Sequence, residues 1–182
     1  PIASKCQVAY LGSILSASAD AKPELTRRLG ETRSSFDELS KCWSHANIPV
    51  RRKLELYRAC VISKLLYSLE SQWLRQDGRQ RLDAFHCMCI RRILKIPSSF
   101  MSRVSNATVL ERACESPLST TLSQRQQDLY KQISLLPESS PLRRVTLEAH
   151  SFQPRLWNVQ RSRGRPKQQW APSVHALLPA AL

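Results

Sequence analysis

Residues 49–66, PVRRKLELYRACVISKLL, decide the fold of this chain. Pro49 suits the first turn of a helix, where its missing N–H has no partner to lose. Apolar side chains then recur at the spacing of one helix face, namely Val50, Leu54, Tyr57, Val61 and Leu65. Past residue 56 most of the segment is apolar, which is typical of a helix surrounded by other helices. The stretch therefore predicts a central helix of a bundle.

The segments on either side carry the same periodicity. Residues 23–45 open at Pro23 and keep one apolar stripe from Leu25 to Trp43, which predicts a single continuous helix. Asp77-Gly78 is expected to break the chain, and a third helix follows with a stripe from Leu82 to Ile96 until Pro97 ends it. Short connections join the three helices. They predict an antiparallel three-helix bundle over residues 22–97.

The rest of the chain is expected to be organised around this bundle. Residues 1–21 hold a short strand or strand–turn–strand around Gly12, within residues 7–15. Residues 98–136 predict additional short helices, one capped near Ser105 and one opened by Pro117. Residues 137–182 are rich in Pro, Ser and Arg and predict a loosely ordered basic tail, with a short last helix over 170–178. The fold class is therefore mainly α.

Composition excludes several classes of protein. The 182 residues include only 4 Gly, which disfavours sandwiches, barrels and glycine-rich phosphate loops. No apolar stretch approaches about 20 residues, so no membrane span is expected. No charged-then-apolar leader opens the chain, so we expect an intracellular protein, nuclear or cytoplasmic, with its 6 Cys reduced. Pro1 stands where an initiator Met would, which indicates a processed chain or a piece of a longer one.

Charge points to a polyanionic partner. The net charge is +14, and residues 22–96 carry 16 basic against 8 acidic residues. Residues 151–182 add 5 basic residues and no acidic one. A positive field over a folded block attracts nucleic acid and speeds encounter with it. We therefore expect a nucleic-acid partner, and neither a membrane nor a small-molecule substrate.

Two basic clusters in the bundle and one in the tail are the candidate phosphate contacts. Those of the bundle are Arg51, Arg52 and Lys53, and Arg91, Arg92 and Lys95. The tail contributes Arg161, Arg163, Gly164, Arg165, Pro166 and Lys167. The run from Arg163 to Pro166 resembles the core of an AT-hook, in which glycine lets the backbone lie close to a narrow minor groove while the arginines enter it.

Catalytic and metal-binding sites are not expected. Cys42 and His45, like His86 and Cys89, are spaced to share a helix face, but Cys89 lies in an apolar stripe and reads as a core residue. No third group is placed to orient a Cys–His pair for nucleophilic catalysis. The prediction is therefore no catalytic residue, no metal ligand and no cofactor in this chain.

The order of several segments resembles the C-terminal part of non-LTR (LINE-type) retrotransposon endonuclease–reverse transcriptases. The resemblance covers about residues 8–176. The segments that carry it are 10–13 (YLGS), 53–67 (KLELYRACVISKLLY), 81–85 (RLDAF), 89–96 (CIRRILKI), 109–113 (VLERA) and 161–170 (RSRGRPKQQW).

The resemblance implies a place for each part of the chain. Tyr10, Leu11 and Gly12 would belong to the primer-grip region at the end of the palm, and the three helices to the thumb that clamps the template–primer duplex. The resemblance thus implies the backbone of an RNA–DNA or DNA duplex as partner. The family's paired catalytic aspartates, which hold two Mg²⁺ ions, lie N-terminal of Tyr10. The four aspartates present, Asp20, Asp37, Asp77 and Asp83, are unpaired in sequence. The chain alone is therefore predicted to be inactive, with Mg²⁺ and the N-terminal polymerase and endonuclease domains missing from it.

Two other interpretations remain open on the sequence. The bundle is compatible with a helical protein-interaction module whose basic tail maintains solubility. It is also compatible with a decayed copy of a retroelement that has no selected function.

Overall fold

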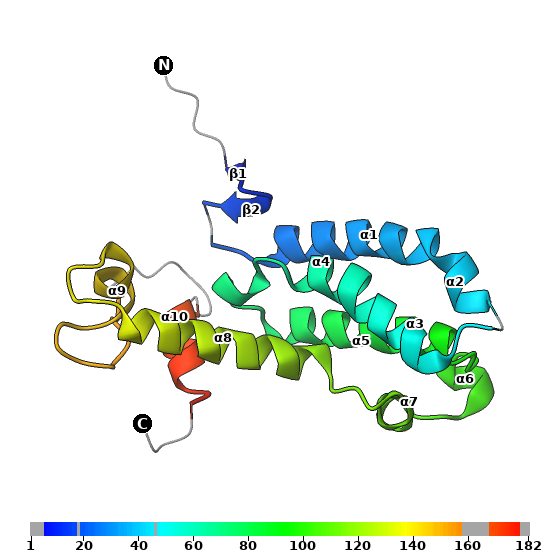
Figure 1. Cartoon of the computed structure of the whole chain (residues 1–182). Helices are drawn as coiled ribbons and strands as arrows, with labels where there is room; N and C mark the ends of the chain where they lie inside the picture. The colour runs from blue at the N-terminus through cyan, green and yellow to red at the C-terminus, as the bar shows by residue number, and fades with distance from the viewer. Residues whose placement is uncertain (1–5, 18, 46, 158–167, 179–182) are drawn as a thin grey trace. The chain divides into compact units, whose positions relative to one another are not determined.

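The computed structural model describes residues 6–17, 19–45, 47–157 and 168–178. It is mainly helical with one two-stranded antiparallel sheet near the N-terminus, which confirms the predicted fold class (Figure 1). The chain divides into two compact units. Unit 1 comprises residues up to Ser68 together with Leu74–Thr121, and unit 2 comprises Leu69–Trp73 and residues from Leu122 onward. None of the helices in the described ranges is both long enough and apolar enough to cross a membrane.

The N-terminal sheet is a tight hairpin, as the sequence indicated. Strand β1 (Gln7–Tyr10) pairs with β2 (Ser13–Ser16), with Tyr10 opposite Ser13. The two turn residues, Leu11 and Gly12, have φ angles of 45° and 76°. Positive φ at both positions marks a turn whose twist matches that of the strands, and Gly12 adopts it without a steric penalty.

The first predicted helix is in fact two, α1 (Lys22–Glu38) and α2 (Ser40–Ser44). Leu39 leaves helical geometry between them, at φ −86° and ψ 13°. The break lets Trp43 fold back, so that its ring stacks on Phe36 at 5.1 Å and its indole N–H donates to the Phe36 carbonyl at 2.8 Å. In one straight helix these two residues would lie about 10 Å apart along the axis. The apolar residues of the predicted stripe do pack together, but they belong to two helices, because the chain turns back at Leu39.

The central segment forms one rod after Pro49, made of α3 (Val50–Tyr57), a π-helical turn (Arg58–Ile62) and α4 (Ser63–Leu66). Its predicted stripe is buried from Leu54 to Leu65, and Tyr57, Val61 and Leu65 are fully buried. The wider π turn adds Ile62 and Leu66 to the buried set. This explains why most of the segment past residue 56 is apolar.

The third helix of the bundle, α5 (Gln76–Ile93), corrects the expected break at Asp77-Gly78. Both residues lie in its first turn, where the lack of a side chain on Gly78 lets Leu25 and Leu74 approach. A Cβ on Gly78 would lie 3.3 Å from Leu25 Cδ2. The helix ends earlier than Pro97: Lys95 takes a left-handed φ of 57°, and Ile96 N donates back to Arg91 O at 2.9 Å. That pattern is a Schellman-type C-terminus.

The core of unit 1 lies between α1, the α3–α4 rod and α5. Its largest fully buried side chains include Phe36, Tyr57, Leu65, Leu82 and Ile90. Two further helices belong to the unit, α6 (Ser99–Ser102) and α7 (Asn106–Ala113). Ser105 caps α7 as expected, accepting a hydrogen bond from Thr108 N at 3.1 Å.

Unit 2 is built on α8 (Leu118–Leu135), which begins in unit 1 and whose residues from Leu122 belong to unit 2. It also contains a 3₁₀ turn (Leu69–Ser71), α9 (Pro141–Thr146) and α10 (Trp170–His175). Tyr130, Leu147 and Val174 form its core, with Trp73 and Trp170 packed against them.

The tail prediction needs correction where the structure describes it. Residues 137–157 are not loosely held: they include α9 and a bridge between Leu147 and Pro154. The buried Tyr130 donates its hydroxyl to Phe152 O at 2.8 Å and fixes the loop that the bridge closes. The last helix is observed, and it ends at His175 rather than at residue 178.

Candidate nucleic-acid interface

The hairpin turn is held to α1 by its backbone. The carbonyl of Gly12 accepts hydrogen bonds from the guanidinium groups of Arg27 and Arg28, and Leu11 O accepts one from Tyr67 Oη at 3.1 Å. Tyr10 and Leu11 nevertheless remain 61% and 75% exposed. The residues implied by the resemblance to line a primer grip therefore have fixed backbones and free side chains.

Glu24 explains why Arg27 and Arg28 are occupied. It is fully buried, and its carboxylate accepts from Arg27 and Arg28 at 2.7 Å each and from Ile14 N at 2.8 Å. Burial alone raises the pKa of Glu24, but the hydrogen bonds from Arg27, Ile14 N and Arg28 outweigh it and hold the pKa below its ordinary value. These two arginines therefore serve the hairpin and are not counted as phosphate contacts.

The cluster at residues 51–53 is partly neutralised and partly buried. Arg51 and Arg52 are exposed, but both pair with Glu55, at 3.3 and 2.7 Å. Lys53 is 3% exposed, and its ammonium donates to the carbonyls of Trp43 and His45 at 2.8 Å each. The prediction of a phosphate contact is therefore wrong for Lys53, which instead caps the end of α2.

The second cluster divides in the same way. Arg91 is 8% exposed and donates to Pro97 O, Val104 O and Asn106 Oδ1 at 2.6–3.1 Å. It ties α5 to the loop around α6, so its assignment as a phosphate contact is also wrong. Arg92 and Lys95 are exposed, as a phosphate contact requires. Arg92 pairs with Asp37 at 2.6 Å and lies 5.6 Å from the Phe36 ring centroid.

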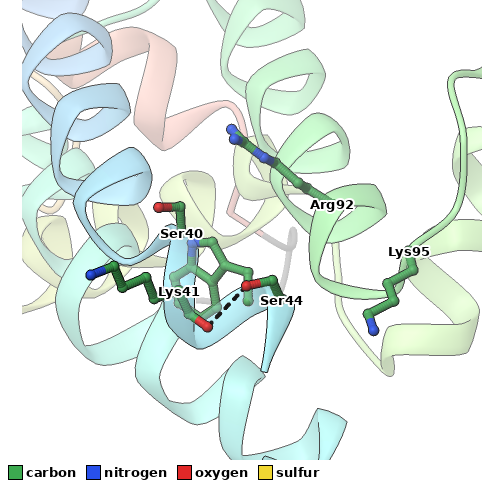
Figure 2. Close-up of a pocket in the computed structure, with 6 residues that line it drawn as sticks. Ser40, Lys41, Ser44, Arg92 and Lys95 are labelled. Carbon is green, nitrogen blue, oxygen red and sulfur yellow. Dashed lines mark hydrogen bonds between the residues drawn. The ribbon is translucent and has the colours of Figure 1, made fainter. Parts of the chain in front are cut away.

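Arg92 and Lys95 line a hollow between α2 and α5 (Figure 2). Its volume is about 380 Å³, and its other lining residues are Ser40, Lys41, Trp43 and Ser44. Figure 2 shows the charged ends of Lys41, Arg92 and Lys95 spread apart rather than meeting at one point. That arrangement suits an extended polyanion better than one small anion.

A second hollow of about 450 Å³ lies between α1 and α5. Its basic residues are Arg33 from α1 and Arg81 from α5, and Leu29, Phe85 and Met88 supply apolar walls. The Arg81 guanidinium reaches Thr26 Oγ1 at 3.3 Å.

The two hollows follow one face of α5. Residues 81, 85, 88 and 92 recur at steps of four, three and four, as one helix face requires, and Lys95 follows just past the end of α5. From Arg81 to Arg92 this face spans about 16 Å, which corresponds to roughly five nucleotides of one strand. We call the basic residues of the two hollows the α1–α5 seam, namely Arg33, Lys41, Arg81, Arg92 and Lys95.

The seam keeps most of its charge. Within the described ranges no carboxylate pairs with Arg33, Lys41 or Lys95, and Asp37 neutralises Arg92. The sequence indicates no role for Arg33 or Lys41, and it places Arg81 only within segment 81–85, which carries the resemblance. In the sequence these residues stand beside the apolar stripe of their helices. That position indicates a shared surface only once α1 and α5 are known to be neighbours.

The remaining sequence candidates take other places. Arg161, Arg163, Gly164, Arg165, Pro166 and Lys167 lie outside the described residues. Within the described ranges no three potential metal ligands come together, around Cys42 and His45 or elsewhere. His86 is buried with its Nδ1 2.9 Å from Tyr57 Oη, and burial raises the pKa of the Cys89 thiol to about 12.

Comparison with known proteins adds no relative: no family model matches the chain, and neither a curated protein nor a solved structure does. A function for the chain therefore rests on the geometry of the seam and on the order of the sequence segments.

Proposed function

We propose that this chain is a nucleic-acid-binding segment of a retrotransposon-type RNA-directed DNA polymerase. The three-helix part of unit 1 would grip the backbone of a template–primer duplex through the α1–α5 seam. The observation that carries the proposal is the seam itself: five basic residues along α1, α2 and α5 and just past the end of α5, four of them without a carboxylate partner in the described part of the chain.

The chemistry of the seam suits a phosphate backbone rather than base recognition. Lys41 and Lys95 carry compact point charges. The guanidinium groups of Arg33, Arg81 and Arg92 can form bidentate hydrogen bonds to phosphate oxygens. Contacts of this type position a duplex without reading its sequence. The proposed role is therefore a grip that tolerates any template.

Catalysis would lie elsewhere in the parent polymerase. The carboxylate of Asp83 accepts hydrogen bonds from Ser119 N and Ser119 Oγ, at 2.8 and 2.6 Å. The carboxylate of Asp37 forms an ion pair with Arg92. The proposal assigns the Mg²⁺ ions and the reacting groups to the polymerase part that the resemblance places before Tyr10.

The test measures affinity for a blunt RNA–DNA hybrid as a function of salt, starting at about 50 mM. Each lost phosphate contact reduces the slope of log K against log salt by about 0.9. Lys41→Ala with Lys95→Ala should therefore flatten the slope by about 2. Arg51→Ala with Arg52→Ala removes the same formal charge from a site paired with Glu55, and is the matched control. Equal losses from both double variants would refute the seam.

A protein-interaction module is the second candidate, and exposed apolar residues of the hairpin favour it. Val8, Tyr10 and Leu15 share one face of the hairpin by register and are 49%, 61% and 52% exposed. A two-stranded sheet with such a face is marginal on its own. If the affinity for the RNA–DNA hybrid does not depend on salt, the protein-interaction module replaces the nucleic-acid-binding segment as the favoured function.

A further inference from the structure

Unit 2 presents two exposed aromatic rings, each with a guanidinium over one of its faces. Phe152 is 63% and Trp157 48% exposed. Arg143 Cζ lies 5.9 Å from the centroid of the Phe152 ring, and Arg155 Cζ lies 4.7 Å from that of Trp157. We call these four residues the aromatic–arginine platform.

The platform is built on fixed backbone. Tyr130 binds Phe152 O, and the Gln169 amide binds both the N–H and the carbonyl of Trp157, at 3.3 and 2.8 Å. The Trp157 indole N–H donates to Val145 O at 3.1 Å. The rings are therefore exposed although the chain that carries them is held in place, so little ordering would be needed when a ligand binds.

The two arginines are also oriented. Arg143 donates to Ser134 O and Leu136 O near the end of α8, and Arg155 donates to Arg144 O at 2.9 Å. Within the described ranges no carboxylate forms an ion pair with Arg143 or Arg155, although Glu138 and Glu148 line the same hollow of about 240 Å³ as both arginines. Glu138 pairs instead with His150, at 2.9 Å.

We propose that the aromatic–arginine platform of unit 2 binds unpaired bases of single-stranded nucleic acid. Every base has a π-face that can stack on the side of Phe152 or Trp157 opposite the guanidinium, and the arginines attract the adjoining phosphates. Exposed aromatics interleaved with arginines are the combination that single-strand-binding surfaces use, and stacking makes them tolerant of sequence. The assignment concerns a different ligand and a different unit from the seam, and it does not depend on the reverse-transcriptase proposal.

The experiment uses the full chain and labelled oligonucleotides of about 16 nucleotides, the upper site size of comparable surfaces. The probes are oligo-dT, oligo-rU and an abasic strand of the same length. Phe152→Ala with Trp157→Ala should weaken binding to oligo-dT and oligo-rU roughly tenfold or more, since stacking of each base contributes about that much. Binding of the abasic strand, which keeps its phosphates but lacks bases, should be unchanged.

Two variants serve as controls. Leu156→Ala removes a side chain that is 71% exposed but has no π-face, so it should leave affinity unchanged. Trp157→Phe keeps a ring and should restore most of the affinity that Trp157→Ala loses.

The outcomes separate this proposal from the seam. Lys41→Ala with Lys95→Ala should weaken binding of the blunt hybrid and leave the base-dependent part of single-strand binding intact. If the aromatic variants bind oligo-dT as the parent chain does, or if Leu156→Ala weakens it equally, the platform is not a base-stacking site. A loss equal for the abasic strand would also overturn it. The salt slope measured for the hybrid tests the seam alone, so it does not depend on any of these outcomes.

Discussion

At the scale of single residues, neighbouring basic side chains of the 51–53 cluster do different work. The guanidinium of Arg51 is exposed to solvent, whereas Lys53 is buried and its ammonium donates hydrogen bonds to Trp43 O and His45 O. A buried carbonyl that loses its donor costs about 1–3 kcal/mol. Two basic residues that lie close together in the sequence therefore have different roles: Arg51 is a surface charge, and Lys53 holds the end of α2 in place.

We expect Lys53→Ala to lower the free energy of unfolding by about 2–3 kcal/mol, because two carbonyls would be left without their donor. Arg51→Ala should change it by less than about 0.5 kcal/mol, as exposed ion pairs contribute little. Urea unfolding measures both. Because Lys53 lies away from the solvent, the salt dependence of hybrid binding should be the same for folded Lys53→Ala and the parent chain. A flattened slope would restore Lys53 as a phosphate contact.

His86 predicts a loss of stability in mild acid. Burial lowers its pKa from 6.5 to about 4, against smaller opposing effects of the Ser116 backbone and Asp83. Between these two values the unfolded chain binds a proton that the folded chain does not, so stability is complete above pH 6.5 and falls as the pH drops toward 4. The full effect is about 3 kcal/mol.

The measurement is urea unfolding at pH 7 and at pH 4.5 for the parent chain and for His86→Asn, which cannot titrate. The variant should be less stable at pH 7, since Tyr57 Oη loses its partner. It should nevertheless lose clearly less stability than the parent between the two pH values. An equal loss in both would show that other groups cause the acid sensitivity.

At the scale of elements, the α1–α2 break depends on a single indole. The Trp43 N–H satisfies Phe36 O near the end of α1, where helix carbonyls lose their own donors. Trp43→Phe keeps the stacked ring but removes that donor. We expect a loss of about 1–2 kcal/mol in urea unfolding.

Trp157→Phe is the matched control for this prediction. Its indole also donates to a carbonyl, Val145 O, but at an exposed position where water can replace it. Its effect on stability should stay within about 0.5 kcal/mol. Equal effects for the two tryptophans would mean that the break is held by ring packing alone.

Periodicity predicted the helices well and their interruptions poorly. The stripes of α1, the α3–α4 rod and α5 identified the core because burial imposes the helical period on the sequence. The break at Leu39 and the continuity through Gly78 depend on contacts between elements: Trp43 with Phe36, and Gly78 with Leu25. Such contacts leave no local signal, since tertiary packing overrides turn and helix preferences.

The sequence predicted the kind of site that we propose, but only some of the residues that line it. Charge density indicated a polyanion-binding surface, yet it could not show that Lys53 and Arg91 reach backbone carbonyls. Long basic side chains bury their stems and carry the charge several ångströms from the Cα. Arg33 and Arg81 became candidates because α1 and α5 pack together and align them along one hollow.

At the scale of the whole molecule, the charge of +14 is divided among regions for which we propose different ligands. The seam belongs to unit 1 and the aromatic–arginine platform to unit 2, while Arg163 and Arg165 lie in the tail outside the described residues. If the sites act independently, their contributions to the salt slope should add, because each neutralised phosphate releases its own counterions.

The last prediction separates tail from seam by sequence preference. Arg163→Ala with Arg165→Ala should flatten the salt slope on duplex DNA by about 2, as should Lys41→Ala with Lys95→Ala, and the quadruple variant should lose about 4. Arginines in a narrow minor groove favour A·T-rich duplexes, whereas backbone contacts do not distinguish them. The tail variant alone should therefore reduce any preference for A·T-rich over G·C-rich duplexes, measured by competition at fixed salt. A preference that survives in the tail variant and disappears in the seam variant would reverse the two assignments.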